Sequence, residues 1–129
     1  MKRNKLFTLL LLRKGIVSLE HPEWIEMECL QLILGSLLIV PEPKNILIVG
    51  LGVGILTQVL DDTLDPDYTS IDVVEIDAGM LDLATRYFFF SPSRRVNIHI
   101  LDGFDYIMSL LNTQLYDIIV LDAFAKGCF

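Results

Sequence analysis

The chain has 129 residues, of which 53% are apolar and 21% charged, and its mean hydropathy is +0.53. These values exclude an intrinsically disordered chain and allow one domain with a buried core. The net charge of −7 is unevenly distributed: residues 1–19 hold five basic and no acidic side chains, which leaves 5 basic and 17 acidic ones in residues 20–129. Nucleic acid binding needs clustered Lys and Arg, so this acidic body predicts no nucleic acid partner. It suits a cationic ligand or a basic protein segment.

Two apolar stretches lie near the N-terminus. Residues 6–12 form an apolar run between basic residues that is too short to span a bilayer and lacks a small-residue cleavage site. We therefore expect a buried strand or helix there, and no membrane association. The second stretch, residues 29–40, predicts a buried helix.

The two cysteines, Cys29 and Cys128, show neither a metal-ligand spacing nor a disulfide framework. They are expected to be free thiols in a reducing compartment, which predicts a cytoplasmic protein.

From residue 46 onward, short β-branched apolar runs alternate with amphipathic helical patterns. The expected strands are 46–49, 71–76, 96–101 and 117–121, and the expected helices are 55–60, 80–88 and 104–111. Strands that are apolar throughout are typical of a parallel sheet covered by helices on both faces. The predicted fold class is therefore α/β, a doubly wound Rossmann-like parallel sheet, which binds ligands beyond the carboxyl ends of its strands.

A glycine-rich loop, with Gly50, Gly52 and Gly54, closes the first of these strands and opens a helix. Glycine lets a ligand lie directly on the backbone, and the helix N-terminus offers free N–H groups to a carboxylate or phosphate. The dinucleotide fingerprint needs a small residue where Ile55 stands, so a smaller nucleoside ligand is favoured over NAD. The alternative is that the glycines serve packing only.

Acidic residues follow the other strands at the same edge. Glu75 interrupts an apolar strand and is predicted to accept both ribose hydroxyls, the alternative being a surface acid. Asp102 could accept from an adenine amino group, with Gly103 giving clearance, or cap the next helix, and these two roles are compatible. Asp77 is ambiguous between a ligand contact and a helix cap. Asp122 is the candidate for orienting or deprotonating a nucleophile.

The remaining polar and aromatic positions are less informative. His99 is expected to pack or meet solvent, and His21 has no metal-ligand neighbour, so no metal site is predicted. Arg94 and Arg95 are expected to be a solvated loop pair. Residues 88–90, three phenylalanines, predict helix-end core, although one ring could flank an adenine.

In combination, these motifs resemble the spermidine-synthase-like branch of the class I S-adenosylmethionine-dependent transferases. The matching stretches are residues 46–54, 74–77, 102–103 and 116–122. Residues 74–81 and 90–107 look most like the methyltransferase-like protein thirteen family, whose corresponding domain methylates translation elongation factor 1A. The resemblance implies a Rossmann-like class I methyltransferase fold and S-adenosylmethionine as cofactor.

The resemblance also assigns roles to residues. The glycine loop would hold the methionine part of the cofactor, Glu75 its ribose and Asp102 its adenine. Asp122 would fall where aminopropyltransferases have their amine-activating aspartate. The implied partner is a protein substrate or a small amine.

Two departures from the aminopropyltransferase pattern favour a methyltransferase that acts on a protein amine. The second aspartate of Asp-Ser-Ser-Asp-Pro falls on Ala125, and residues 24–26 read Trp-Ile-Glu where those enzymes tend to have Tyr-Gln-Glu or Tyr-His-Glu. The alternatives are an aminopropyltransferase of polyamine biosynthesis and a non-catalytic nucleoside-binding or interaction fragment.

The family fold has seven strands, and about four are expected here. Residues 1–40 would be an N-terminal strand or helix extension, and residues 41–129 the N-terminal half of the cofactor-binding domain. In the family strand order, residues 118–121 would then form an uncovered apolar edge, which predicts a poorly soluble, inactive chain. The alternative is that residues 1–40, or a second copy of the chain in a homodimer, cover this edge.

Overall fold

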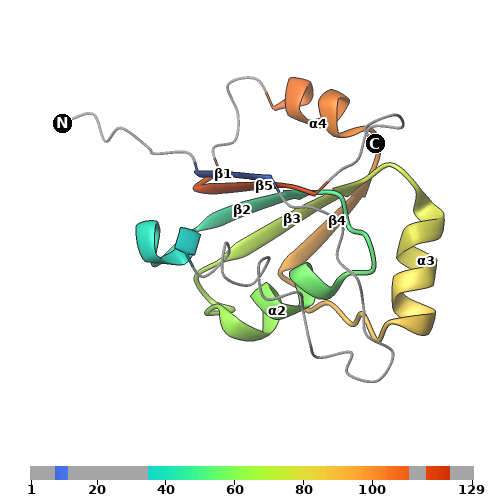
Figure 1. Cartoon of the computed structure of the whole chain (residues 1–129), viewed down its shortest axis with the longest axis horizontal. Helices are drawn as coiled ribbons and strands as arrows, with labels where there is room; N and C mark the ends of the chain where they lie inside the picture. The colour runs from blue at the N-terminus through green and yellow to red at the C-terminus, as the bar shows by residue number, and fades with distance from the viewer. Residues whose placement is uncertain (1–7, 12–34, 111–115, 123–129) are drawn as a thin grey trace.

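The computed structural model describes residues 8–11, 35–110 and 116–122; within 8–11 it describes the backbone only (Figure 1). The strands are β1 (Thr8–Leu11), β2 (Asn45–Val49), β3 (Ser70–Glu75), β4 (Val96–Ile100) and β5 (Ile118–Leu121), and the helices are α2 (Ile55–Thr63), α3 (Ala78–Tyr87) and α4 (Gly103–Ser109). Every strand and helix expected after residue 45 is present. Cys29, Cys128 and His21 lie outside the described residues, as do residues 24–26 and Ala125.

The sheet has the strand order β1-β5-β2-β3-β4, and every neighbouring pair is parallel. In the central register, Ile46 of β2 lies opposite Ile71 of β3 on one side and Ile118 of β5 on the other. Parallel pairing brings all carboxyl ends to one edge of the sheet. This arrangement confirms the α/β Rossmann-like class and places the predicted site residues along that edge.

The prediction that β5 forms an uncovered edge of the sheet is wrong. β1 pairs with β5 in parallel over four residues, from Thr8 opposite Ile118 to Leu11 opposite Leu121. The described sheet therefore contains the four strands expected after residue 45 together with β1. Of the two alternatives, the one in which residues 1–40 cover the edge is the one observed. The physical reason is that unpaired N–H and C=O groups along an apolar strand are costly, and Thr8–Leu11 provide partners for those of β5.

Helices cover both faces of the sheet, with α2 and α3 on one side and α4 on the other (Figure 1). The apolar cluster on the α2/α3 face comprises Ile46, Ile48, Leu51, Leu56, Leu60, Ile71, Val73, Ala84, Phe90, Ile118 and Val120. The cluster on the α4 face comprises Leu47, Val49, Val74, Tyr106 and Tyr116. The alternating inward and outward positions of each strand thus feed two separate cores.

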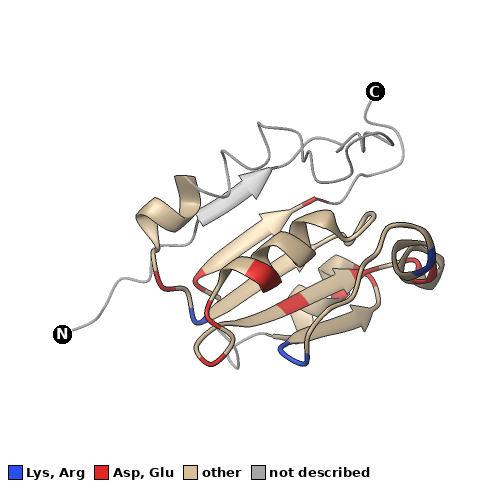
Figure 2. Cartoon of the chain, turned by 90° about the horizontal axis from the view of Figure 1, so that it is seen from below, with Lys and Arg blue, Asp and Glu red and all other residues tan. Residues whose placement is uncertain are grey.

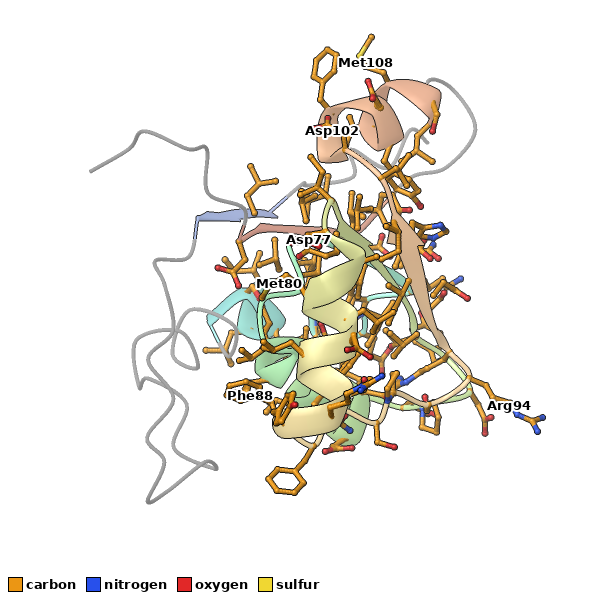
Figure 3. All side chains as sticks on the ribbon, turned by 90° about the vertical axis from the view of Figure 1, so that its right-hand side faces the viewer. Asp77, Met80, Phe88, Arg94, Asp102 and Met108 are labelled. Carbon is orange, nitrogen blue, oxygen red and sulfur yellow. The ribbon has the colours of Figure 1, made fainter. Side chains whose placement is uncertain are left out.

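The expectation of a solvated arginine pair is wrong for Arg95 and correct for Arg94, which is exposed and points away from the sheet (Figure 3). Arg95 Nε donates to Asp61 Oδ1 at 2.7 Å, and the two side chains are only 8% and 4% exposed. The guanidinium also donates to four carbonyl groups around the C-terminal end of α2, those of Leu60, Asp61, Leu64 and Asp65. Arg95 is buried because it satisfies carbonyls that a helix end leaves unpaired.

The Asp61 carboxylate completes this cap. Burial would raise its pKa, but hydrogen bonds from Arg95 and Ser93 outweigh burial and lower the pKa. A buried ion pair with its hydrogen bonds satisfied fixes the loop before β4 against α2.

The helix expected to be buried at residues 29–40 is described from residue 35, and residues 35–39 are helical. Here the expectation of burial is wrong in part, because Leu38 and Ile39 are 86% and 59% exposed. Leu37 and Val40, three residues apart, pack against the core, so this helix is amphipathic. None of the described helices is long and apolar enough to cross a membrane.

Candidate functional site

The glycine loop between β2 and α2 adopts backbone conformations that side chains rarely tolerate. Gly50, Gly52 and Gly54 have φ of +103°, +56° and +82°. A Cβ at Gly54 would lie 2.6 Å from the buried Phe90 ring, so this glycine is required for packing. A Cβ at Gly52 would meet nothing within 4 Å. Gly52 therefore turns an open stretch of backbone outward, as a loop that receives a ligand would.

The N-terminus of α2 differs from those of α3 and α4. Gly54 occupies its N-cap and makes no side-chain hydrogen bond to the helix. In α3 the Asp77 carboxylate accepts from Gly79 N at 2.8 Å, and in α4 the Asp102 carboxylate accepts from Phe104 N at 2.8 Å. A helix start without a side-chain cap leaves N–H groups for an external anion.

Glu75 joins the glycine loop to the start of α3. It is 8% exposed, and its two oxygens accept from different backbone groups, Oε2 from Leu51 N at 2.9 Å and Oε1 from Asp77 N at 3.0 Å. Burial excludes the alternative of a surface acid. A carboxylate offers about four acceptor positions, so about two remain after the backbone bonds. That number matches the two vicinal hydroxyls of a ribose.

Asp77 and Asp102 are both N-caps, of α3 and α4 respectively. The helix-cap role that the sequence suggested for each of them is therefore confirmed. Figure 3 shows them at the same end of the sheet, Asp77 at the start of α3 and Asp102 at the start of α4. Both bonds to Asp102 end on Oδ1, from Phe104 N at 2.8 Å and Asp105 N at 3.3 Å. No hydrogen bond found among the described residues ends on Oδ2, so capping leaves one oxygen for a ligand.

Gly103 allows α4 to approach the sheet closely. A Cβ there would lie 2.6 Å from Val49 Cγ1, the last side chain of β2 before the glycine loop. The small size of Gly103, which the sequence suggested would leave room for an adenine, is therefore needed to pack the first turn of α4 against β2. This packing sets the distance between Asp102 and the loop.

Asp122 follows β5 directly and lies beside the glycine loop. Its N–H donates to the carbonyl of Val49 at 2.8 Å. Burial, and then the charge of Glu75, raise its pKa to about 6. A carboxylate with a raised pKa at this edge is suited to accept a proton near neutral pH.

Acidic positions dominate the described part of the chain. Figure 2 shows them across strands, helices and loops, whereas the described basic positions are Lys44, Arg86, Arg94 and Arg95. Within the described residues, no group of three or more His, Cys, Asp or Glu side chains could hold a metal ion. The surroundings therefore favour a cationic ligand through charge.

Sequence reasoning missed a buried polar cluster beneath α4. Asp72, in the middle of β3, is 6% exposed and accepts a hydrogen bond from Tyr116 at 2.7 Å, and Tyr116 contacts Tyr106 at 2.8 Å. One signal was present: Asp72 interrupts an apolar strand as Glu75 does, and a buried acid needs partners.

Comparison with known proteins decides the family. A family model of the spermine/spermidine synthase domain matches residues 31–128. The chain belongs to the spermine/spermidine synthase domain family. It is 43% identical over 91 residues to the eEF1A lysine and N-terminal methyltransferase of Mus musculus, covering 69% of this chain and 13% of that protein. It is 44% identical over 92 residues to the polyamine aminopropyltransferase of Vibrio vulnificus (strain CMCP6), covering 70% of this chain and 30% of that enzyme.

A solved structure adds the fold. The crystal structure of human methyltransferase-like protein 13 in complex with SAH matches with a TM-score of 0.61 at 38% identity, covering 78% of this chain and 46% of that one. The resemblance predicted from the motifs is thereby confirmed, as is the class I methyltransferase fold with similarity to spermidine synthase. The chain spans less than a third of the length of the two relatives named above.

Proposed function

We propose that this protein binds S-adenosylmethionine at the carboxyl edge of its sheet and transfers the methyl group to a protein amine of the elongation factor 1A type. The observation that best supports this function is the geometry of Glu75, a buried carboxylate fixed by Leu51 N and Asp77 N with two acceptor positions left. The mouse relative, named a methyltransferase of eEF1A lysine and N-terminus, supports the substrate class.

The residues of the edge fit the parts of this cofactor. The uncapped N-terminus of α2 suits the carboxylate of the methionine part, and Gly52 leaves room for it. Glu75 would hold the ribose, and Oδ2 of Asp102 would accept from the adenine amino group. When bound, the cofactor supplies a methyl group on a cationic sulfonium.

The protein's part in the reaction is positioning and charge. Glu75 and Asp122 place negative charge near the loop, which stabilises a bound sulfonium. Asp122 accepts a proton from the ammonium form of the substrate. This step frees the lone pair with which the neutral amine attacks. Holding donor and amine in line supplies most of the remaining rate.

Aminopropyl transfer is the second candidate function, favoured by the family model and by the Vibrio vulnificus relative. Its donor lacks the carboxylate and has no use for the uncapped N-terminus of α2. The two functions therefore differ in which donor the protein binds more tightly.

Competition calorimetry with S-adenosylmethionine and its decarboxylated form separates these candidates. We expect the carboxylate form to bind at least about tenfold more tightly, since a hydrogen bond to a charged group contributes roughly 1.5–3 kcal/mol. Radiolabelled methyl transfer to elongation factor 1A, with a diamine as the alternative acceptor, then tests the reaction. Tighter binding of the decarboxylated form with transfer to the diamine would establish the second candidate instead.

A further inference from the structure

The cluster beneath α4 is a directed chain of hydrogen bonds that ends on a buried acid. Tyr116 donates to Asp72 Oδ2 at 2.7 Å, so its own proton is committed. The 2.8 Å contact between the two tyrosine oxygens must then be donated by Tyr106. The order of donation is Tyr106 to Tyr116 to Asp72, from the helix through the loop before β5 to the middle of the sheet.

Asp72 is itself fixed from the other side. Its Oδ1 accepts from Asn97 Nδ2 at 3.0 Å and lies 3.4 Å from His99 Nε2, and both residues belong to β4. The His99 ring in turn packs on Tyr106, with 4.8 Å between the ring centroids. The acceptor end of the chain therefore cannot rotate freely, which makes it a rigid reference point for the helix.

Within the described residues, Tyr106 is the main anchor of helix α4 to the sheet. Tyr106 is its one buried residue, whereas Phe104 and Met108 are 70% and 46% exposed. Figure 3 shows Met108 and the neighbouring helix surface directed away from the sheet. The other described contacts of this segment are the close approach of Gly103 to Val49 and the packing of Leu110, the C-cap residue, on the same cluster.

Tyr106 is one helical turn from the residue that faces the ligand edge. Its N–H donates to the carbonyl of Asp102 at 3.0 Å. A shift of the Tyr106 ring is therefore transmitted directly to the N-cap, and with it to Asp102 Oδ2, the oxygen left after capping.

We propose that Tyr106, Tyr116 and Asp72 form a positioning relay that orients Asp102 toward the adenine amino group of the cofactor and so sets base recognition. The inference rests on the proposed function and deepens it, because it assigns selectivity for the base to residues that touch no ligand. The three are positioning residues, and Asp102 is the contact.

The first test compares S-adenosylhomocysteine with S-inosylhomocysteine, in which an oxygen replaces the adenine amino group. Calorimetry on the wild-type chain should show a preference of about tenfold for the adenosyl ligand. Tyr106→Phe and Tyr116→Phe should each reduce that preference at least fivefold and leave the affinity for the inosyl ligand within about twofold. Tyr87→Phe, which alters a tyrosine that is 72% exposed on α3, is the matched control and should change neither value.

If the tyrosines had a purely structural role, the variants would lose affinity for both ligands by similar factors. That result would overturn the proposal. Tyr106→Phe is the milder variant, because it leaves the bond from Tyr116 to Asp72 in place and should fold even if Tyr116→Phe does not.

The second test needs no ligand and separates the relay from the proposed function. Hydrogen exchange in the free protein should speed up at the capped amides of Phe104 and Asp105 in both variants, with the Gly79 amide at the cap of α3 unchanged. Unchanged exchange at α4 would refute the relay. If the wild-type chain bound neither ligand, the proposed function would fail and the inference about base recognition with it.

Discussion

The two faces of the sheet are held to their helices by different forces. On the α2/α3 face, apolar side chains such as Ile48, Ile71 and Val73 cover the middle of the strands, and the buried Arg95–Asp61 pair lies at the end of α2. On the α4 face Asp72 of β3 accepts from Asn97 of β4 and receives a chain of tyrosine hydroxyls. Apolar burial is nondirectional and tolerates small displacements, whereas hydrogen bonds fix orientation. On the α4 face the directional contacts reach the helix from the middle of a strand, which orients α4 over the sheet.

Truncation on the apolar face should cause the largest loss of stability. Ile71 is fully buried in the cluster, so Ile71→Ala removes its contacts and leaves a cavity that costs about 2–5 kcal/mol. The measurement is urea denaturation, with Leu38→Ala as the control, because Leu38 is 86% exposed and should change stability by no more than about 0.5 kcal/mol. Similar losses in the two variants would show that this face does not form the main core.

Removal of the acid on the polar face should cost less and act through hydrogen bonds. Asp72→Ala leaves the Tyr116 hydroxyl, buried beneath α4, without its acceptor, a loss of about 1–3 kcal/mol. Asp82→Ala is the control, because Asp82 pairs with Arg86 on the surface of α3 and such pairs contribute about 0–1 kcal/mol. If Asp72→Ala were as stable as wild type, the cluster would not hold α4.

Asp122 lies at the edge that both faces share, and its substitution should affect the reaction more than binding. Asp122→Asn removes the proton acceptor, so turnover should fall at least about tenfold, while affinity for S-adenosylhomocysteine, which carries no sulfonium charge, stays nearly constant. In the wild-type protein, activity should rise with pH through about 6, since the carboxylate must be ionised to accept a proton. A pH–rate profile with the same ascending limb in the variant would exclude Asp122 as that acceptor.

Alkaline pH should lower the free energy of unfolding through the polar face. We expect this effect to be smaller than those of the substitutions above. Burial raises the pKa of both Tyr106 and Tyr116, and the hydrogen bond that Tyr116 donates to Asp72 raises the pKa of Tyr116 further. Folding therefore favours the protonated hydroxyls, so their contribution is complete below the ordinary tyrosine pKa of about 10 and is lost as pH rises beyond it. Urea denaturation from pH 8 to 11 should show this decline, and the decline should shrink in Tyr116→Phe. An equal decline in both proteins would assign it to other groups.

The apolar face and the edge could be predicted from the sequence because their signals are local. Strand patterns, glycines and the acids that follow strands indicate where Gly50 and Glu75 lie. Arg95 and the Tyr106–Tyr116–Asp72 chain could not be predicted, since their partners are 10 to 44 residues apart and meet only in the folded sheet. The cover of β5 by β1 joins residues still further apart and depends on which free edge an apolar segment can reach.

The central claim is that Glu75 holds the ribose of an adenosyl cofactor, and calorimetry with S-adenosylhomocysteine tests it most directly. Glu75→Gln keeps the size of the side chain but removes its charge and replaces one acceptor oxygen by an NH2 donor, so affinity should fall at least about tenfold. Glu42→Gln, an exposed glutamate in the loop before β2, is the matched control and should bind as the wild type does. Circular dichroism would establish that both variants are folded. Affinity of folded Glu75→Gln within about twofold of wild type, or no binding by the wild type itself, would contradict the claim.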